Sequence, residues 1–165
     1  MPRATDRPRS ELHEVDSPEA TQDVAATLAA RLPGGSVVHL SGDLGTGKTQ
    51  FAKGLARGLG LDPDDVLSPT FTLVHPHAPA TGRADALGFV HVDLYRISNP
   101  ADVEELGLSE LPGSDAIAAV EWPERLGDRA APGAVSVVLT DLGGTRRRIA
   151  IGWPDDDDLA PGRVT

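Results

Sequence analysis

The 165-residue sequence contains no cysteine. This absence excludes disulfide frameworks, zinc fingers and a cysteine nucleophile, and it fits the reducing cytoplasm, where we expect the protein to act. Long hydrophobic runs are also missing, because the longest uninterrupted one covers only residues 116–120, whereas ~20 residues are needed to cross a bilayer. The first ten residues hold three arginines with no apolar stretch behind them. The sequence therefore predicts neither contact with a membrane nor a secretory signal peptide.

Basic residues are in the minority. The 15 Lys and Arg residues oppose 25 Asp and Glu residues, which gives a formal net charge of −10, and only two lysines occur, Lys48 and Lys53. A protein that binds nucleic acid over a broad surface needs clustered cations facing the phosphates. We therefore expect no extensive direct contact with nucleic acid. The arginine run at 146–148 lies beside a predicted turn, which favours a solvated strand edge over a nucleic-acid patch.

One motif carries a specific chemistry. Gly42, Gly47, Lys48 and Thr49 occupy the fixed positions of the pattern G-x-x-x-x-G-K-[ST], the P-loop, which a chain of this composition would match by chance about three times in a thousand. The glycines allow consecutive backbone N–H groups to converge on phosphate oxygens, and the helix that follows adds its dipole. The lysine of such a loop reaches the β- and γ-phosphates, and the threonine hydroxyl binds Mg²⁺. The sequence therefore predicts a nucleoside triphosphate site.

Strand-like and helical patterns alternate around this loop. Ser17 and Pro18 have the residue types that begin a helix, and Phe51, Leu55 and Leu59 mark the buried face of the helix after the loop. Strands are expected at 37–40, 89–95 and 116–122, a hairpin at 135–139 and 147–151, and an aperiodic loop at 75–88. The pattern predicts an α/β fold of P-loop NTPase type, with a mostly parallel sheet flanked by helices and an antiparallel C-terminal hairpin.

The length suits one domain with short tails. We expect the P-loop domain to cover residues 15–154. Residues 1–14 are rich in proline and arginine without periodicity, and residues 155–165 are acidic, so flexible tails are expected at both ends.

Two acids end predicted strands, Asp93 and Glu121. In open α/β sheets the ligand lies beyond the carboxyl ends of the strands, so both acids are candidates for holding magnesium or positioning water. Glu121 closes the most hydrophobic strand, where a carboxylate is costly unless it meets a cation or a polar partner. A solvated strand-end acid is the alternative for each, and Trp122 either covers the site or simply packs.

The bound nucleotide is predicted to be ATP. Guanine-specific switch proteins carry an Asn-Lys-x-Asp element, and no such element exists here because both lysines lie in or near the P-loop. Thr70, in the run Ser-Pro-Thr-Phe, is a candidate sensor of the γ-phosphate, with a proline-kinked strand edge as the alternative. The histidines show no spacing typical of metal ligands.

Four segments in order resemble one family. They are Ser-Gly-Asp-Leu-Gly-Thr-Gly-Lys-Thr at 41–49, Ser-Pro-Thr-Phe-Thr-Leu-Val at 68–74, His-Val-Asp-Leu-Tyr-Arg at 91–96 and Val-Glu-Trp-Pro-Glu at 120–124. The sequence is similar to the TsaE family, also called YjeE, the small ATPase of bacterial tRNA threonylcarbamoyladenosine biosynthesis. The resemblance covers roughly residues 17–153 and is far more specific than the P-loop alone.

This resemblance implies a P-loop sheet of five or more strands and hydrolysis of ATP. It also implies a partnership with the TsaD–TsaB proteins, which place threonylcarbamate on the adenosine next to the anticodon of ANN-decoding tRNAs. The TsaE-like chain would reach tRNA only indirectly, through that complex, and would not itself perform the transfer.

The resemblance also implies roles for single residues. Lys48 would contact phosphate and Thr49 magnesium, and Thr70 would sense the nucleotide. Asp93 and Glu121 would be acids linked to magnesium, with catalytic roles beside Lys48, Glu121 alternatively positioning the attacking water. Further expected nucleotide contacts are Asp43, Leu44, Gly45, Thr46, Gly47, Gln50 and Trp122.

Two features depart from the family pattern. The Pro- and Ala-rich stretch at 75–88 is longer than expected there, and Val92 stands where an aromatic residue is usual.

Two other functions stay open at this point. A small-molecule kinase of P-loop fold would need an arginine-rich lid, whereas the long loop at 75–88 holds one arginine, Arg83. A binding module would keep ATP as a structural ligand. Partner-stimulated release of free phosphate, without a phosphorylated acceptor, would distinguish an ATPase from both.

Overall fold

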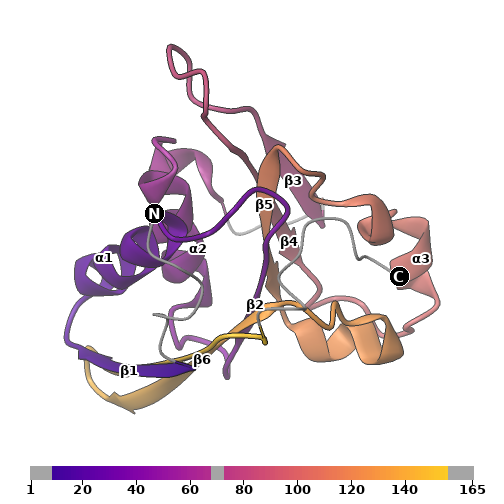
Figure 1. Cartoon of the computed structure of the whole chain (residues 1–165). Coiled ribbons are helices and arrows are strands. Elements are labelled where there is room, and N and C mark those ends of the chain that lie inside the picture. Colours follow the sequence, from indigo (N-terminus) through magenta and orange to yellow (C-terminus); the bar gives the residue numbers. More distant parts are fainter. Residues whose placement is uncertain (1–8, 68–72, 156–165) are drawn as a thin grey trace.

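The protein forms a single seven-stranded sheet in the order β1-β7-β6-β2-β5-β4-β3 (Figure 1), as seen in a computed structural model that describes residues 9–67 and 73–155. The strands are β1 (Ser10–Val15), β2 (Val37–Ser41), β3 (Val74–His77), β4 (Gly88–Asp93), β5 (Ala116–Glu121), β6 (Val135–Gly143) and β7 (Arg146–Gly152). The central pairings β6–β2, β2–β5 and β5–β4 are parallel. Those at both margins are antiparallel. The predicted α/β fold, with its antiparallel C-terminal hairpin, is confirmed.

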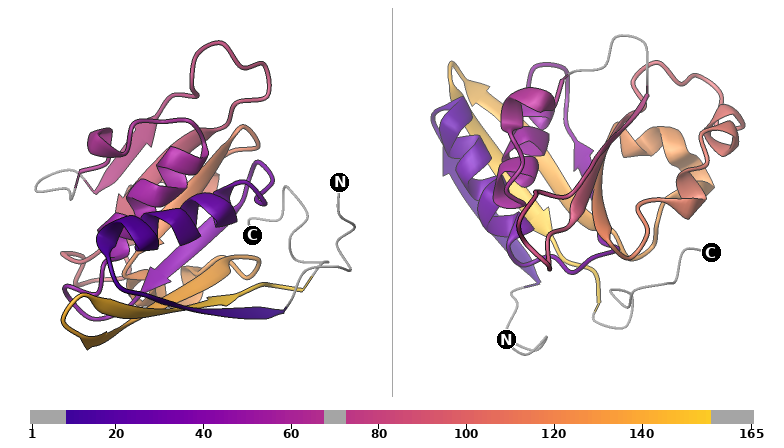
Figure 2. Two further views of the ribbon diagram at one scale, coloured as in Figure 1. Left: turned by 90° about the vertical axis from the view of Figure 1, so that its left-hand side faces the viewer. Right: turned by 90° about the horizontal axis from the view of Figure 1, so that it is seen from above.

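Helices cover the two faces of the sheet unequally (Figure 2). On one face, α1 (Pro18–Ala29) and α2 (Lys48–Gly58) enclose the larger hydrophobic core. On the other, α3 (Asp102–Glu105) and the 3₁₀ turns η3 (Leu108–Glu110) and η4 (Pro123–Arg129) cover a smaller cluster. A further 3₁₀ turn, η2 (Pro63–Asp65), follows α2. Within the described residues, no helix is both long and apolar enough to cross a membrane.

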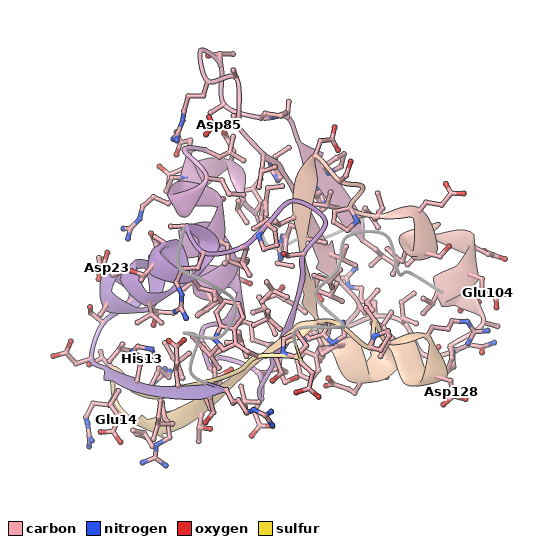
Figure 3. All side chains as sticks on the ribbon, viewed as in Figure 1. His13, Glu14, Asp23, Asp85, Glu104 and Asp128 are labelled. Carbon is pink, nitrogen blue, oxygen red and sulfur yellow. The ribbon has the colours of Figure 1, made fainter. Side chains whose placement is uncertain are left out.

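Acidic side chains lie on the outside of these layers. Asp23 on α1, Glu104 on α3 and Asp128 on η4 are exposed and point away from the sheet (Figure 3). Their carboxylates lie in solvent, where repulsion between like charges is screened, and Asp23 and Glu104 also pair with Arg57 and Arg129.

Close packing of α1 and α2 fixes the helix that follows the phosphate loop. Ser17 caps α1 by accepting a hydrogen bond from the Ala20 N–H at 3.0 Å, and Pro18 takes the first helical position, as the sequence predicts. Gly54 and Gly58 of α2 face α1, and a methyl group at Gly54 would lie only 2.5 Å from the Gln22 carbonyl oxygen. The two helices can therefore approach more closely than side chains at these positions would allow.

The N-terminal boundary differs from the prediction. Residues 10–14, expected in a flexible tail, belong to β1, which pairs with β7. Charged residues hide the alternation of this strand, because Glu11 turns inward and accepts hydrogen bonds from Arg31 at 2.6 Å and Trp153 at 2.9 Å. At the other end, the expected tail at 155–165 lies outside the described residues except for Asp155.

The stretch at 75–88 is also not loop throughout. Its first residues lie in β3, which pairs antiparallel with β4. Pro76 opposes Val90 there, and proline is tolerated because β3 is the last strand at this margin of the described sheet, where a missing N–H breaks no further pairing. The prolines that predicted a loop are thus compatible with an edge strand.

Candidate nucleotide site

The phosphate loop joins β2, in the middle of the sheet, to the N-terminus of α2. Gly42, Gly45 and Gly47 all have positive φ angles, of 148°, 79° and 98°. Any other residue at Gly42 would also place its Cβ 2.6 Å from both the Leu139 carbonyl oxygen and the Thr46 hydroxyl. The N-cap residue of α2 is Gly47, which has no side chain to accept a hydrogen bond, so the first N–H groups of the helix can serve an anion.

Lys48 lies across this loop. Only 6% of the residue is exposed, and its Nζ donates hydrogen bonds to the carbonyl oxygens of Gly42 at 2.6 Å and Asp43 at 2.8 Å. Burial lowers the pKa of Lys48, against the opposing influence of the Glu121 carboxylate and other nearby acids. A buried ammonium group that donates its hydrogen bonds to backbone carbonyl oxygens is well suited to exchange them for phosphate oxygens, which carry full charge.

Asp93 and Glu121 are neighbours. They end the parallel strands β4 and β5, whose register pairs their Cα atoms directly. Each side chain points to the α2 face, because each shares the alternation of strand residues in the larger core, Phe89 and Ile117. Two carboxyl groups that were candidates independently are thereby brought together beside the phosphate loop.

Glu121 is connected to that loop by its hydrogen bonds. The residue is 2% exposed, and its Oε1 accepts a hydrogen bond from Thr49 Oγ1 at 3.0 Å. Its Oε2 lies 3.2 Å from Nε2 of His91, a residue of β4 that is fully buried. Burial raises the pKa of Glu121, but the hydrogen bonds from His91, Thr49 and Asp93 outweigh burial and lower it. The alternative of a solvated strand-end acid is therefore wrong for Glu121.

Asp93 has the opposite tendency. Burial and the adjacent Glu121 carboxylate raise the pKa of Asp93, although its Oδ1 also accepts a hydrogen bond from the Tyr95 N–H at 2.9 Å. Since like charges in one site resist ionising together, Glu121 loses its proton more readily than Asp93 does. A cation entering the site would favour the ionised form of both groups.

Trp122 forms one wall of the site. Its ring lies 4.3 Å from Lys48 Nζ, within cation–π range, and 5.1 Å from the Tyr95 ring. Trp122 is also the one described non-glycine residue with a positive φ angle, 60°, and such strain in a non-glycine residue is characteristic of functional sites. Trp122 also packs against the smaller hydrophobic cluster, so the structure fits both of the roles considered for it.

These residues line one cleft with a volume of about 490 Å³. Its lining consists of Leu44, Gly45, Gly47, Lys48, Thr49, Gln50, Leu73, Asp93, Tyr95, Arg96, Glu121 and Trp122. A volume of this size suits a small-molecule ligand. A separate cavity of about 400 Å³ lies on the opposite face of the sheet and includes no residue of the phosphate loop and neither of these acids.

Two of the predicted contacts, Asp43 and Thr46, are not among the residues that line the cleft. Thr46 is buried, and its hydroxyl donates a hydrogen bond to the Asp43 carbonyl oxygen at 2.8 Å. Gln50 lines the cleft, and its side chain accepts a hydrogen bond from Gln22 of α1 at 2.9 Å. Thr70, the predicted nucleotide sensor, lies outside the described residues.

Sequence reasoning missed several residues of the site, among them His91, Tyr95 and Arg96. All three fall in the segment 91–96 that carries part of the family resemblance, from which only Asp93 was assigned a role. The signal for His91 was its position two residues before Asp93, since residues i and i+2 of a strand share a face.

The site offers a partial set of donors for a metal ion. In the described ranges, no group of three or more His, Asp or Glu side chains is placed to hold a metal by itself. Mg²⁺ in nucleotide sites commonly takes one or two protein oxygens and completes its shell with phosphate oxygens and water. Thr49, Asp93 and Glu121 fit that kind of site, in which magnesium is held together with a phosphate ligand.

Comparisons with known proteins identify the family. The sequence model of the family "Threonylcarbamoyl adenosine biosynthesis protein TsaE" matches residues 15–149. The tRNA threonylcarbamoyladenosine biosynthesis protein TsaE of Synechocystis sp. is 43% identical over 111 residues, which is 65% of this chain and 66% of the relative. The protein of the same description from Bacillus subtilis is 35% identical over 133 residues, or 81% and 79% of the two chains.

A solved structure agrees with these relatives. The crystal structure of Bacillus subtilis YdiB superimposes with a TM-score of 0.72 at 28% identity, covering 90% of this chain and 88% of YdiB. The family match, the sequence relatives and the fold all point the same way. This chain belongs to the TsaE family, whose proteins take part in tRNA threonylcarbamoyladenosine biosynthesis.

Proposed function

We propose that this chain binds ATP with Mg²⁺ in the cleft described above and hydrolyses it. The single observation that carries the proposal is the hydrogen bond of 3.0 Å between Thr49 and Glu121. It joins the magnesium-binding position of the phosphate loop to an acid at the end of an adjacent strand, and in P-loop NTPases a loop hydroxyl and a strand-end acid together hold Mg²⁺.

Each residue of the cleft has a definite part in this proposal. The N–H groups at the start of α2 and the Lys48 ammonium bind the phosphates. Bound Mg²⁺ would neutralise charge on the phosphates and the leaving group, and Thr49 and Asp93 would hold it. Glu121 orients the attacking water and, because it is already ionised, accepts a hydrogen bond from that water without first losing a proton. Trp122 covers Lys48 and limits access of bulk water.

We further infer that hydrolysis serves the modification of tRNA in the cytoplasm, together with a TsaD–TsaB-like protein complex. Family membership supports the pathway. The net charge of −10 supports a protein partner over direct binding of tRNA, because an acidic chain is repelled by nucleic acid phosphates.

The test is a comparison of Glu121→Gln with Glu105→Gln, which removes an exposed acid on α3. In the presence of the partner proteins, wild type and Glu105→Gln should release free phosphate from ATP. Glu121→Gln should still bind Mg-ATP but turn over about 10²-fold more slowly, with kcat reduced and KM unchanged, since it loses a contact made in the transition state. Wild-type turnover in Glu121→Gln would contradict the assigned role. Transfer of phosphate to an acceptor instead of water would favour the kinase alternative.

A further inference from the structure

The three consecutive arginines at the start of β7 do not share one environment. Arg146 and Arg148 are 60% and 44% exposed, and both reach Glu14 of β1, at 3.7 and 2.9 Å. These two fit the expected solvated edge. Arg147 is only 20% exposed, and strand alternation places it on the same face as the buried Ile149. This is the face on which the phosphate loop lies, so the interpretation of the run as a solvated edge is wrong for Arg147.

The hairpin holds the Arg147 guanidinium in a fixed position. Its Nη1 donates hydrogen bonds to Asp141 Oδ1 at 3.0 Å and to the carbonyl oxygens of Gly144 and Arg146, each at 2.8 Å. Asp141 is the direct partner of Arg147 in the β6–β7 register, and its Oδ1 also accepts the Gly143 N–H at 2.7 Å. The guanidinium group is therefore anchored by the turn from which it extends.

The second terminal nitrogen of the Arg147 guanidinium, Nη2, reaches the phosphate loop. Arg147 Nη2 donates a hydrogen bond of 3.3 Å to the Gly45 carbonyl oxygen, across 102 residues of sequence. Gly45 is exposed, has a φ angle of 79°, and a Cβ there would meet no atom of the described residues within 4 Å. Leu44 beside it is 68% exposed. The tip of the loop is thus glycine-containing and thinly packed, which makes it costly in entropy to order.

The same hairpin also supports the base of the loop. The Leu139 carbonyl oxygen of β6 lies so close to Gly42 that a Cβ there would approach it to 2.6 Å, and the Leu139 side chain lies 3.8 Å from the Cβ position of Gly47. Base and tip of the loop therefore rest on one structural element, outside the strand and the helix that the loop connects.

We propose that Arg147 is a positioning residue of the nucleotide site, which braces the Gly45 peptide so that the phosphate loop is ordered before its ligand binds. The inference deepens the proposed function, on which it rests. A preordered loop lowers the entropy that binding must overcome. Because the brace acts on the phosphate loop, it raises affinity for ATP and ADP alike, independently of the base.

The neighbouring carboxylate indicates that this effect is mainly geometric. Asp141 compensates the charge of Arg147 at 3.0 Å, so little of that charge is left to attract the phosphates directly. Lysine keeps the charge but lacks the planar fork that bonds Asp141 and Gly45 at once. Both Arg147→Lys and Arg147→Met should therefore release the loop.

The first experiment measures hydrogen exchange of the full chain without nucleotide. Peptides covering residues 42–49 should exchange faster in Arg147→Met and Arg147→Lys than in wild type, whereas Arg146→Met, which removes an equal charge one residue away, should match wild type. Faster exchange throughout the sheet, including β4 and β5, would overturn the proposal, because it would make Arg147 a general stabilising residue.

The second experiment measures affinity for Mg-ADP and Mg-ATP by calorimetry. Loss of one hydrogen bond and of the ordered tip should weaken binding of both nucleotides about 3- to 10-fold in the two Arg147 variants. KM for ATP should rise with kcat unchanged, and Arg146→Met should bind as wild type does.

These outcomes distinguish failure of the role of Arg147 from failure of the proposed nucleotide binding. Wild-type affinity and loop exchange in Arg147→Met would show that Arg147 does not order the phosphate loop. Wild-type behaviour of Arg147→Lys alone would show that its effect is not geometric, which also overturns the proposal. Failure of wild type itself to bind either nucleotide would overturn the proposed function, and the exchange measurement would still report whether Arg147 orders the loop.

Discussion

Replacing His91 by leucine should destabilise the protein through Glu121. His91 is fully buried, and its Nε2 lies 3.2 Å from Glu121 Oε2. An ionised carboxylate only accepts hydrogen bonds, so Nε2 is the donor. Leucine fills a similar volume but donates nothing, so it deprives a carboxylate that is 2% exposed of one of its hydrogen-bond donors.

The magnitude follows from this burial. A hydrogen bond to a charged group contributes about 1.5–3 kcal/mol, and removal of one partner from a buried pair costs about 3–5 kcal/mol. Because Thr49 still bonds the other oxygen of Glu121, we expect the lower part of that range. His91→Leu should lower the free energy of unfolding by about 3 kcal/mol at neutral pH.

A double-mutant cycle isolates the interaction. Glu121→Gln replaces the charge by an amide, so in that background His91→Leu no longer strands a buried anion. The second substitution should then cost at least about 1.5 kcal/mol less than it does in wild type, which is the coupling energy of the pair. Urea denaturation of the four proteins, followed by tryptophan fluorescence, gives each free energy. Additive effects, or a loss below about 0.5 kcal/mol in His91→Leu, would refute the reasoning.

Three further outcomes are expected. Asp93→Asn should raise the Mg²⁺ concentration needed for ATP binding about tenfold, and an unchanged titration midpoint would exclude Asp93 from the metal site. Hydrogen bonds, the strongest from Arg31, lower the pKa of Glu11 from 4.5 to about 2 against the effect of burial, so stability present above pH 4.5 should fall as the pH drops toward 2. Glu11→Gln should remove about 1–3 kcal/mol of that dependence, and an equal decline between pH 5 and 2 in both proteins would disprove it. Gly54→Ala should lower the melting temperature despite the better helix propensity of alanine, since the added methyl meets α1; an unchanged or higher value would show that α1 gives way.

The phosphate loop and the order of the main elements could be predicted because both depend on residues that are close together in the sequence. Ser17 marks a helix start through its own side chain, and the alternation around Gly143 marks a hairpin without reference to the rest of the chain. The strands missed were those at the margins. β1 carries charged residues and β3 contains Pro76, and edge positions tolerate both because only one side of the strand is paired.

The sequence allowed the residues of the site to be identified, but not the contacts between them. Asp93 and Glu121 could be selected as strand-end acids, but their contact depends on the parallel register of β4 and β5, which a single sequence does not reveal. The same applies to Arg147, whose reach to Gly45 depends on how the hairpin lies against the loop. Long-range pairing decided both.

Calorimetric titration of Mg-ATP into Lys48→Met tests whether the phosphate loop binds ATP. Methionine keeps the apolar stem of this buried side chain and removes the ammonium group that phosphate would engage. Lys53→Met, at the chain's other lysine, is the matched control, and circular dichroism checks that both variants fold. Wild type and Lys53→Met should bind Mg-ATP, and Lys48→Met should bind it at least about 50-fold more weakly. Equal affinity in all three proteins would contradict binding of ATP by the phosphate loop.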